Sequence, residues 1–139
     1  MDEKDRLLLT LLRRDARRSV VALARDLGLS RTATQDRLAK LQASGAIAGF
    51  TVVEGSAAAR ESAYLTIKFA SGYRCPQVVP MLKRIPAIEM IHSVTGPVDL
   101  IVRVAAETVA GIEAARAAIA EVPGIAEVST HVVLERHLG

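Results

Sequence analysis

The sequence is poor in the residues that build several kinds of functional site. Its 139 residues include no tryptophan, only 3% aromatic residues, one cysteine and three histidines. The single cysteine, Cys75, excludes an internal disulfide, and the scattered histidines give no Cys/His spacing for a zinc site. So few aromatic rings also argue against stacking on the bases of single-stranded nucleic acid. We therefore expect no structural metal and no cofactor.

The chain also lacks a long apolar segment. No apolar run approaches the about 20 residues that cross a bilayer, and the first residues are charged, unlike those of a signal peptide. Half of the residues are apolar and 24% are charged, a mixture typical of a folded protein with one domain or two small ones. We expect a cytoplasmic protein with no membrane partner.

The positive charge is confined to the first half of the chain. Residues 1–60 carry eleven Lys or Arg against seven Asp or Glu, whereas residues 61–139 carry seven against eight. Fourteen of the eighteen basic residues are arginine, whose planar guanidinium suits phosphate and guanine edges. The first half is therefore expected to bind a polyanion, and duplex DNA is the better target.

The pattern of residues 1–53 predicts three helices. Asp2 can cap the first helix, Ser19 the second and Ser30 the third. Gly28 ends the second helix just before Ser30, so the second and third helices meet through a tight turn. This arrangement is typical of a helix-turn-helix, although an ordinary antiparallel helix pair fits the same pattern.

A β-rich run follows the third helix. Residues 46–53 read as a wing or a connecting strand. Residues 54–61 lack an amphipathic period and contain small residues, so we interpret them as a linker. The first 53 residues are therefore predicted to form a winged helix-turn-helix domain.

The predicted third helix turns groove-reading residue types outward. Arginine can bind guanine O6 and N7, and glutamine can bind adenine N6 and N7. The candidate base contacts are Arg31, Thr32 and Gln35, and the candidate backbone contacts are Arg17, Arg18, Arg37 and Lys40, with Ser30 at the helix N-terminus. A merely solvated helix face is the alternative, and the acidic Asp36 on the same face favours it mildly.

The pattern of residues 62–139 predicts a second domain with strands and helices in the order β-α-β-β-α-β. The strands cover residues 63–69, 88–95, 99–105 and 127–135, and the helices run from Pro76 to about Arg84 and from Thr108 to before Pro123. This order is the ferredoxin-like arrangement. The fold class is therefore α+β.

The predicted sheet leaves one face without helices. The second and fourth strands place apolar residues on both sides, so we expect the uncovered side not to be very polar. Large exposed apolar surfaces mark interfaces. We therefore expect two copies of the chain to dimerise sheet to sheet, which would supply two DNA readers for a palindromic site.

The sequence resembles the Lrp/AsnC family of transcription regulators over nearly its whole length. In the first half the matching positions are Asp5-Arg6, Leu8-Leu9, Leu12, Asp15-Ala16-Arg17, Leu23-Ala24, Gly28-Leu29-Ser30, Arg37-Leu38, Leu41, Gly45, Ile47 and Gly49-Phe50. In the second half they are Val94-Thr95-Gly96, Asp99 and Pro123-Gly124-Ile125. Their order and spacing over two domains carry the resemblance.

The resemblance implies a prokaryotic, nucleoid-associated regulator that dimerises through its second domain and assembles further into tetramers or octamers. It also implies an amino acid or a related metabolite as effector, bound between dimers beside the loop that holds Thr95, Gly96 and Asp99. Backbone N–H groups near Gly96 could hold a carboxylate, and Asp99 could accept from an ammonium. Family members commonly carry an acidic residue and an aromatic where this chain has Pro97 and Val98. A turn glycine followed by a capping aspartate is the alternative explanation of this loop.

Two rival functions fit part of the sequence. The sirohaem decarboxylases resemble the same family and would need His92, His131 or basic residues around a cavity as acid–base groups. Those two histidines fall on opposite edges of the predicted sheet. The second rival, an effector sensor that no longer binds DNA, is disfavoured by the basic character of residues 1–60.

Overall fold

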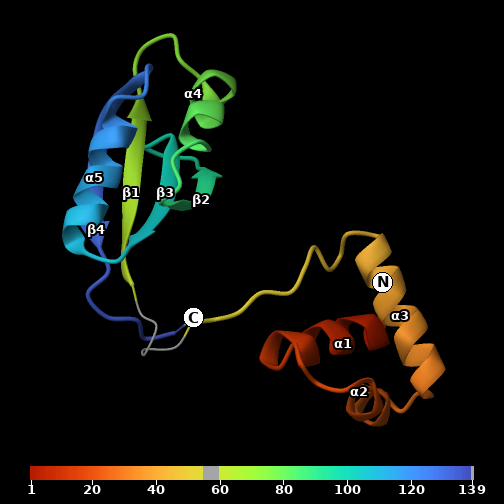
Figure 1. Ribbon diagram of the computed structural model, residues 1–139. Helices are drawn as coiled ribbons and strands as arrows, with labels where there is room; N and C mark the ends of the chain where they lie inside the picture. The colour runs from red at the N-terminus through yellow and green to blue at the C-terminus, as the bar shows by residue number, and fades with distance from the viewer. Residues whose placement is uncertain (55–59, 139) are drawn as a thin grey trace. The chain divides into compact units, whose positions relative to one another are not determined.

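A computed structural model describes residues 1–54 and 60–138 of the chain. It divides into two compact units, Met1–Val53 and Glu54–Gly139. In the described residues the first unit has three helices, and the second has two helices and a four-stranded sheet; Figure 1 labels these elements. The expected linker, 54–61, lies mostly outside the described residues, and its last residue, Glu61, opens the first strand.

The first unit is a bundle of three short helices: α1 (Glu3–Arg14), α2 (Val20–Leu27) and α3 (Arg31–Ala43). The predicted N-caps are confirmed, because the side chains of Asp2, Ser19 and Ser30 each accept a hydrogen bond from a backbone N–H in the first turn. The three helices bury one cluster of leucines, made of Leu8, Leu12, Leu23, Leu27 and Leu41. Burial of this cluster stabilises the unit, since each helix alone is too short to be stable in water.

The predicted wing is wrong. The structure assigns no strand to residues 46–53. Only Ile47 reaches the leucine cluster, and its N–H donates to Leu41 O at 3.0 Å. Val52 and Val53 are 82% and 74% exposed. The β-rich composition has no strand to pair with in the described part of this unit, and a strand requires such a partner.

The second unit is a four-stranded antiparallel sheet with both helices on one face (Figure 1). In chain order its elements are β1 (Glu61–Phe69), α4 (Cys75–Leu82), β2 (Ile88–Ser93), β3 (Leu100–Ala106), α5 (Val109–Ala120) and β4 (Ile125–Val132). The strand order across the sheet is β2-β3-β1-β4. The predicted ferredoxin-like order is therefore confirmed.

The core of this unit lies between the sheet and the two helices. The central strands bury alternate residues, including Leu65 and Val102, against Val78 of α4 and Ile112 of α5. The helix predicted to reach Arg84 ends at Leu82. The last strand ends at Val132 and not at Glu135, because the chain leaves the sheet shortly after Val132 pairs with Ala63.

The other side of the sheet, which we call the open face, carries both polar and apolar residues. Paired residues on neighbouring strands point to the same side, so Tyr64 shares the open face with Arg103 and His131. Met90 of β2 pairs with Arg103, so it lies on this face too. An apolar residue therefore reaches the open face from β2, as expected, whereas Val128 of β4 turns toward the helices and packs on the core. The pattern of β4 alone did not fix which of its two sides faces the helices.

Candidate nucleic-acid interface

The turn between α2 and α3 has the geometry of a helix-turn-helix. Gly28 adopts the left-handed conformation with φ 64°, which ends α2. The N–H of Leu29 then donates to Ala24 O at 2.9 Å. Two residues after the glycine, the Ser30 hydroxyl accepts a hydrogen bond from Ala33 N at 3.1 Å and begins α3. Glycine is needed at this turn because a left-handed residue with a Cβ is strained.

The outward side of α3 carries the residues expected to read bases. Arg31, Thr32 and Gln35 are exposed, whereas Thr34 and Leu41 are buried against the rest of the unit. Lys40 is exposed further along the helix. Within the described part of the chain, no ion pair engages Arg31 or Lys40. The first five residues of α3 therefore present a guanidinium, a hydroxyl and an amide to solvent at the N-terminal end of the helix.

The residues expected to bind phosphates differ in exposure and in ion pairing. Arg17 is exposed. Arg18 forms an ion pair with Asp26, its Nε lying 2.6 Å from the carboxylate. Ser30 lies between α2 and α3, and its hydroxyl caps α3 by accepting the N–H of Ala33. Among the described residues, Arg17 and Lys40 are therefore the basic side chains of the predicted backbone set without an ion pair.

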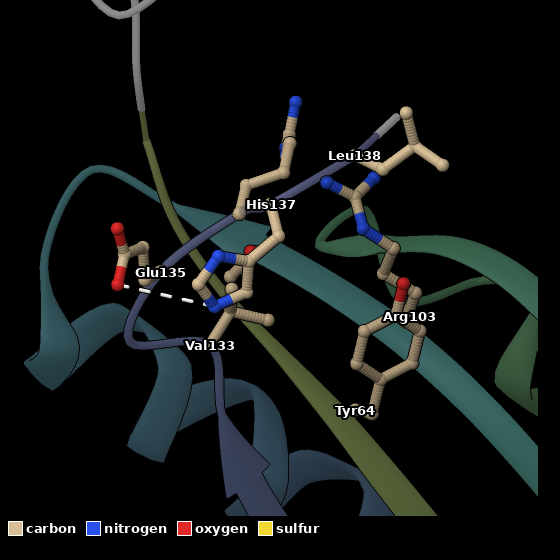
Figure 2. A pocket seen from close by; sticks show the side chains of 8 residues that line it. Tyr64, Arg103, Val133, Glu135, His137 and Leu138 are labelled. Carbon is tan, nitrogen blue, oxygen red and sulfur yellow. Dashed lines mark ion pairs between the residues drawn. The ribbon is translucent and has the colours of Figure 1, made fainter.

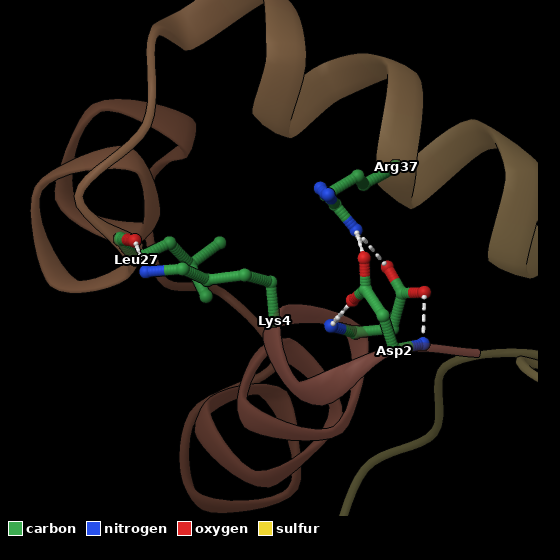
Figure 3. Close-up of polar contacts among 5 residues, drawn as sticks. Asp2, Lys4, Leu27 and Arg37 are labelled. Carbon is green, nitrogen blue, oxygen red and sulfur yellow. Dashed lines mark hydrogen bonds and ion pairs between the residues drawn. The ribbon is translucent and has the colours of Figure 1, made fainter.

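Arg37 points away from the outward side of α3 and onto α1 (Figure 3). Its Nη1 donates to Asp2 Oδ2 at 2.6 Å and to Asp5 Oδ1 at 2.8 Å. The backbone N–H of Asp5 and then the Arg37 guanidinium lower the pKa of Asp2. The backbone N–H of Asp2 and then the same guanidinium lower the pKa of Asp5. Sequence reasoning found the cap at Asp2 but missed this contact, because it joins residues 35 positions apart.

The loop between β2 and β3 contains the residues expected to bind an effector. Thr95 and Gly96 are exposed, and Gly96 has φ 104°. Asp99 Oδ2 accepts the N–H of Phe69 at 2.7 Å, and the Asp99 N–H donates to Ile67 O at 2.8 Å. One carboxylate oxygen of Asp99 is thus used to close the loop onto the end of β1.

A hollow of about 550 Å³ lies over the open face, beneath the last residues of the chain. Figure 2 shows Tyr64 and Arg103 of the sheet on one side and Glu135 and His137 of the C-terminal segment on the other. His137 Nε2 and Glu135 Oε2 are 3.9 Å apart, with the two side chains 82% and 76% exposed. The hollow therefore does not shield this pair from water, as a catalytic site generally would.

The two histidines considered for the decarboxylase alternative lie on different strands. His92 lies on β2 and His131 on β4, at the two edges of the sheet as predicted. Across residues 1–54 and 60–138, no three His, Cys, Asp or Glu side chains come close enough to hold a metal ion. No helix in that part of the chain has the length and apolar character to cross a membrane.

The first unit and the basic surface of α3 define the class of the protein, a helix-turn-helix DNA-binding regulator with an α+β second domain. Residues 1–42 match the family model of the AsnC-type helix-turn-helix domain. Residues 62–138 match that of the Lrp/AsnC ligand binding domain. The chain belongs to the Lrp/AsnC family of transcription regulators.

Curated relatives and solved structures agree with this family. The HTH-type transcriptional regulator FL11 of Pyrococcus abyssi is 26% identical over 139 residues, covering 99% of this chain and 91% of that protein. An uncharacterized HTH-type transcriptional regulator of Pyrococcus horikoshii is 31% identical over 110 residues, which cover 76% of this chain and 73% of that protein.

Solved bacterial structures share this fold. LrpC of Bacillus subtilis has a TM-score of 0.82 at 20% identity, with 98% of this chain and 96% of that chain covered. A transcriptional regulator of Neisseria meningitidis, solved as a complex with L-Met, has a TM-score of 0.88 at 15% identity, with 100% and 93% covered.

Proposed function

We propose that α3 reads the sequence of duplex DNA through Arg31, Thr32 and Gln35. The observation that carries this proposal is the exposure of all three at the N-terminal end of α3, beside a helix-turn-helix turn. A recognition helix places its N-terminal residues against base edges in the major groove. The guanidinium of Arg31 and the amide of Gln35 are each able to make paired hydrogen bonds to one purine.

In this proposal Arg17 and Lys40 bind backbone phosphates. Ser30, at the N-terminus of α3, and Arg18 make further phosphate contacts. A helix N-terminus offers backbone N–H groups to a phosphate. Arg18 must share its guanidinium between a phosphate and Asp26. Arg37 is already held by Asp2 and Asp5, so it is left out of the phosphate contacts.

Binding to a selected duplex at several salt concentrations tests these roles. Arg31→Ala is expected to weaken binding by about 1–3 kcal/mol and to relax the preference at one base pair. Lys40→Ala is expected to weaken binding to all duplexes alike and to reduce the slope of log K against log salt by about 0.9. Arg116→Ala is the matched control, since Arg116 pairs with Glu113 on α5 of the other unit. Unchanged binding by both helix variants would refute the interface.

The protein works as a dimer formed through the second unit, and dimers assemble further into tetramers or octamers. The open face of the sheet supports this, because the described helices cover only the opposite side. Its mixed character, with Tyr64 beside Arg103, suits an interface that joins polar contacts to apolar ones. Light scattering on the eluting protein measures the mass, and a monomer at micromolar concentration would contradict the assembly.

An amino acid or a related metabolite binds at the loop of Thr95, Gly96 and Asp99 and changes assembly, and so DNA affinity. The match to the ligand binding domain supports a small-molecule effector, as does the relative solved with L-Met. Among the described residues, the second oxygen of Asp99 accepts no hydrogen bond and is placed to accept from an ammonium. A coupling of about 1–3 kcal/mol would change DNA affinity about 5- to 150-fold.

Two variants separate the role of Asp99 as a ligand from its role in the loop. Asp99→Asn keeps an acceptor for Phe69 N but removes the charge, so it is expected to keep the fold and lose the effector response. Asp99→Ala also leaves that N–H without its partner, and is expected to lower stability by about 1 kcal/mol. The assay is DNA binding with a panel of amino acids. An intact response in Asp99→Asn would remove this residue from the effector site.

The protein acts by binding and not by catalysis. The separation of His92 and His131 across the sheet supports this. We place the DNA-binding domain at 1–53, the linker at 54–61, the effector and oligomerisation domain at 62–139, and the protein at the nucleoid in the cytoplasm. A coloured preparation that binds a tetrapyrrole and ignores duplex DNA would favour the enzyme instead.

A further inference from the structure

The first turn of α1 contacts both helices of the helix-turn-helix (Figure 3). It begins with a reciprocal cap between Asp2 and Asp5. The Asp5 N–H donates to Asp2 Oδ1, and the Asp2 N–H donates to Asp5 Oδ2, both at 2.9 Å. These two hydrogen bonds fix the position of both carboxylates on the backbone of α1.

The remaining carboxylate oxygens face Arg37 of α3. Asp2 Oδ2 and Asp5 Oδ1 both accept from the same nitrogen, Arg37 Nη1, at 2.6 Å and 2.8 Å. The side chains of Arg37 and Asp5 are 29% and 16% exposed. The Asp2 side chain is 53% exposed, so Asp5 is the part-buried member of the pair. Charged hydrogen bonds to two preorganised acceptors, one of them part-buried, restrict the guanidinium more than a single surface ion pair does.

The residue between the two carboxylates contacts the other helix. Lys4 Nζ donates to the carbonyl oxygen of Leu27, the last residue of α2. Leu27 directly precedes Gly28, whose left-handed conformation forms the turn. One turn of α1 therefore binds the end of α2 and the middle of α3, on either side of the turn that joins them.

We infer that Arg37, held by Asp2 and Asp5, is a positioning residue that sets the direction in which α3 presents its base-reading side chains. This inference rests on the proposed function, in which α3 reads duplex DNA. Residues two positions apart lie about 200° apart around a helix, so Arg37 and Gln35 face different ways. A change at Arg37 reaches the DNA by altering the direction of α3.

Positioning and phosphate contact predict opposite effects of the acidic partners. If Arg37 held a phosphate, removing the charges of Asp2 and Asp5 would release the guanidinium and remove repulsion, so binding would tighten. If Arg37 positions α3, the same change loosens the helix and weakens binding. Asparagine is as good an N-cap as aspartate, and its one oxygen can keep the cap bond. Asp2→Asn with Asp5→Asn therefore preserves the start of α1 but removes both charges and the two oxygens that accept from Arg37.

The experiment compares three full-length variants with the wild-type chain: Arg37→Gln, the double variant Asp2→Asn with Asp5→Asn, and the triple combination. Dissociation constants are measured for a selected duplex and a scrambled one at several salt concentrations, at a temperature where circular dichroism shows each variant folded. Arg37→Lys is included as the conservative variant. Asp36→Asn is the matched control, since Asp36 is an exposed acid on α3 with no ion pair in the described part of the chain.

Arg37→Gln and the double variant are each expected to weaken specific binding roughly tenfold, the usual size of coupling between contacting charged residues. The triple variant is expected to bind no more weakly than Arg37→Gln or the double variant, because all three substitutions break the same contact between Arg37 and the two carboxylates. The salt slope and the affinity for scrambled duplex are expected to stay nearly unchanged, Arg37→Lys to recover part of the loss, and Asp36→Asn to bind as well as wild type or better.

Several results would overturn the inference. One is a salt slope that falls by about 0.9 in Arg37→Gln together with tighter binding by the double variant, which would make Arg37 a phosphate contact. Another is full wild-type affinity in all three variants. A wild-type chain without preference for any duplex would overturn the proposed function as well, whereas the first two results would leave that function standing.

Discussion

Two glycines of the second unit have positive φ but different surroundings, which makes them a matched pair for a stability test. φ is 104° at Gly96 and 94° at Gly124. An L side chain at either position is strained by about 1–3 kcal/mol. A Cβ at Gly96 would meet nothing within 4 Å, whereas one at Gly124 would lie 2.2 Å from Cδ1 and 2.5 Å from Cγ of Tyr73. The two positions therefore share the backbone strain and differ in the steric clash.

We expect Gly96→Ala to lower the free energy of unfolding by about 1–3 kcal/mol, from the backbone alone. Gly124→Ala is expected to lower it by roughly 1–3 kcal/mol more, since the Tyr73 ring must move from its position. Urea denaturation followed by circular dichroism measures both changes. Tyr73→Ala, alone and combined with Gly124→Ala, tests the cause, because removing the ring should recover the steric part.

Equal stability of the two glycine variants would show that the Tyr73 ring adds no steric cost at Gly124. A Tyr73→Ala change that destabilises Gly124→Ala as much as it destabilises the wild type would show the same, because the ring would then not be the obstacle. Either result would mean that the contact between Tyr73 and Gly124 is looser than the distances indicate.

Two further predictions concern the separate units. Leu65→Ala removes a fully buried side chain of the sheet and is expected to destabilise the second unit by about 2–5 kcal/mol. Thermal unfolding is followed by circular dichroism. If the second unit of this variant melts while the helices of the first unit remain folded, the two units unfold separately. In the folded chain the pKa values of Asp2 and Asp5 are lowered from the ordinary value of an aspartate. The two carboxylates therefore stabilise the fold above that ordinary value, and the stabilisation is lost as acidification passes through the lowered folded pKa values. Acid unfolding of the first unit should therefore be less steep in Arg37→Gln, and an unchanged profile would contradict the ion pairs.

Local signals in the sequence were enough to predict most of the helix-turn-helix. Asp2, Ser19 and Ser30 are capping residues by type, and Gly28 is the residue that a left-handed helix end requires, so the helix boundaries follow from nearest neighbours. The prediction of a wing was wrong because it rested on the β-forming composition of residues 46–53. Composition does not show whether a partner strand is present. A strand depends on backbone hydrogen bonds to another segment.

The candidate site was predictable only where exposure follows from helical periodicity. Arg31, Thr32 and Gln35 point outward as the pattern indicates. The ion pairs of Arg37 with Asp2 and Asp5 depend on how α3 crosses α1, which no local pattern of residues describes. The side of β4 that faces the helices was not predictable for a related reason, since the sides of this edge strand are assigned by its pairing with β1.

The claim that α3 reads duplex DNA is tested most directly by selecting bound fragments from the genome of the source organism at low salt, with the wild-type chain and with Arg31→Ala in parallel. The wild type is expected to enrich a sequence with two half-sites about one helical turn, or a multiple of it, apart. Arg31→Ala is expected to lose the preference at one position of each half-site. Fragments drawn equally from all sequences by the wild type, or an identical enriched sequence in the variant, would contradict this claim.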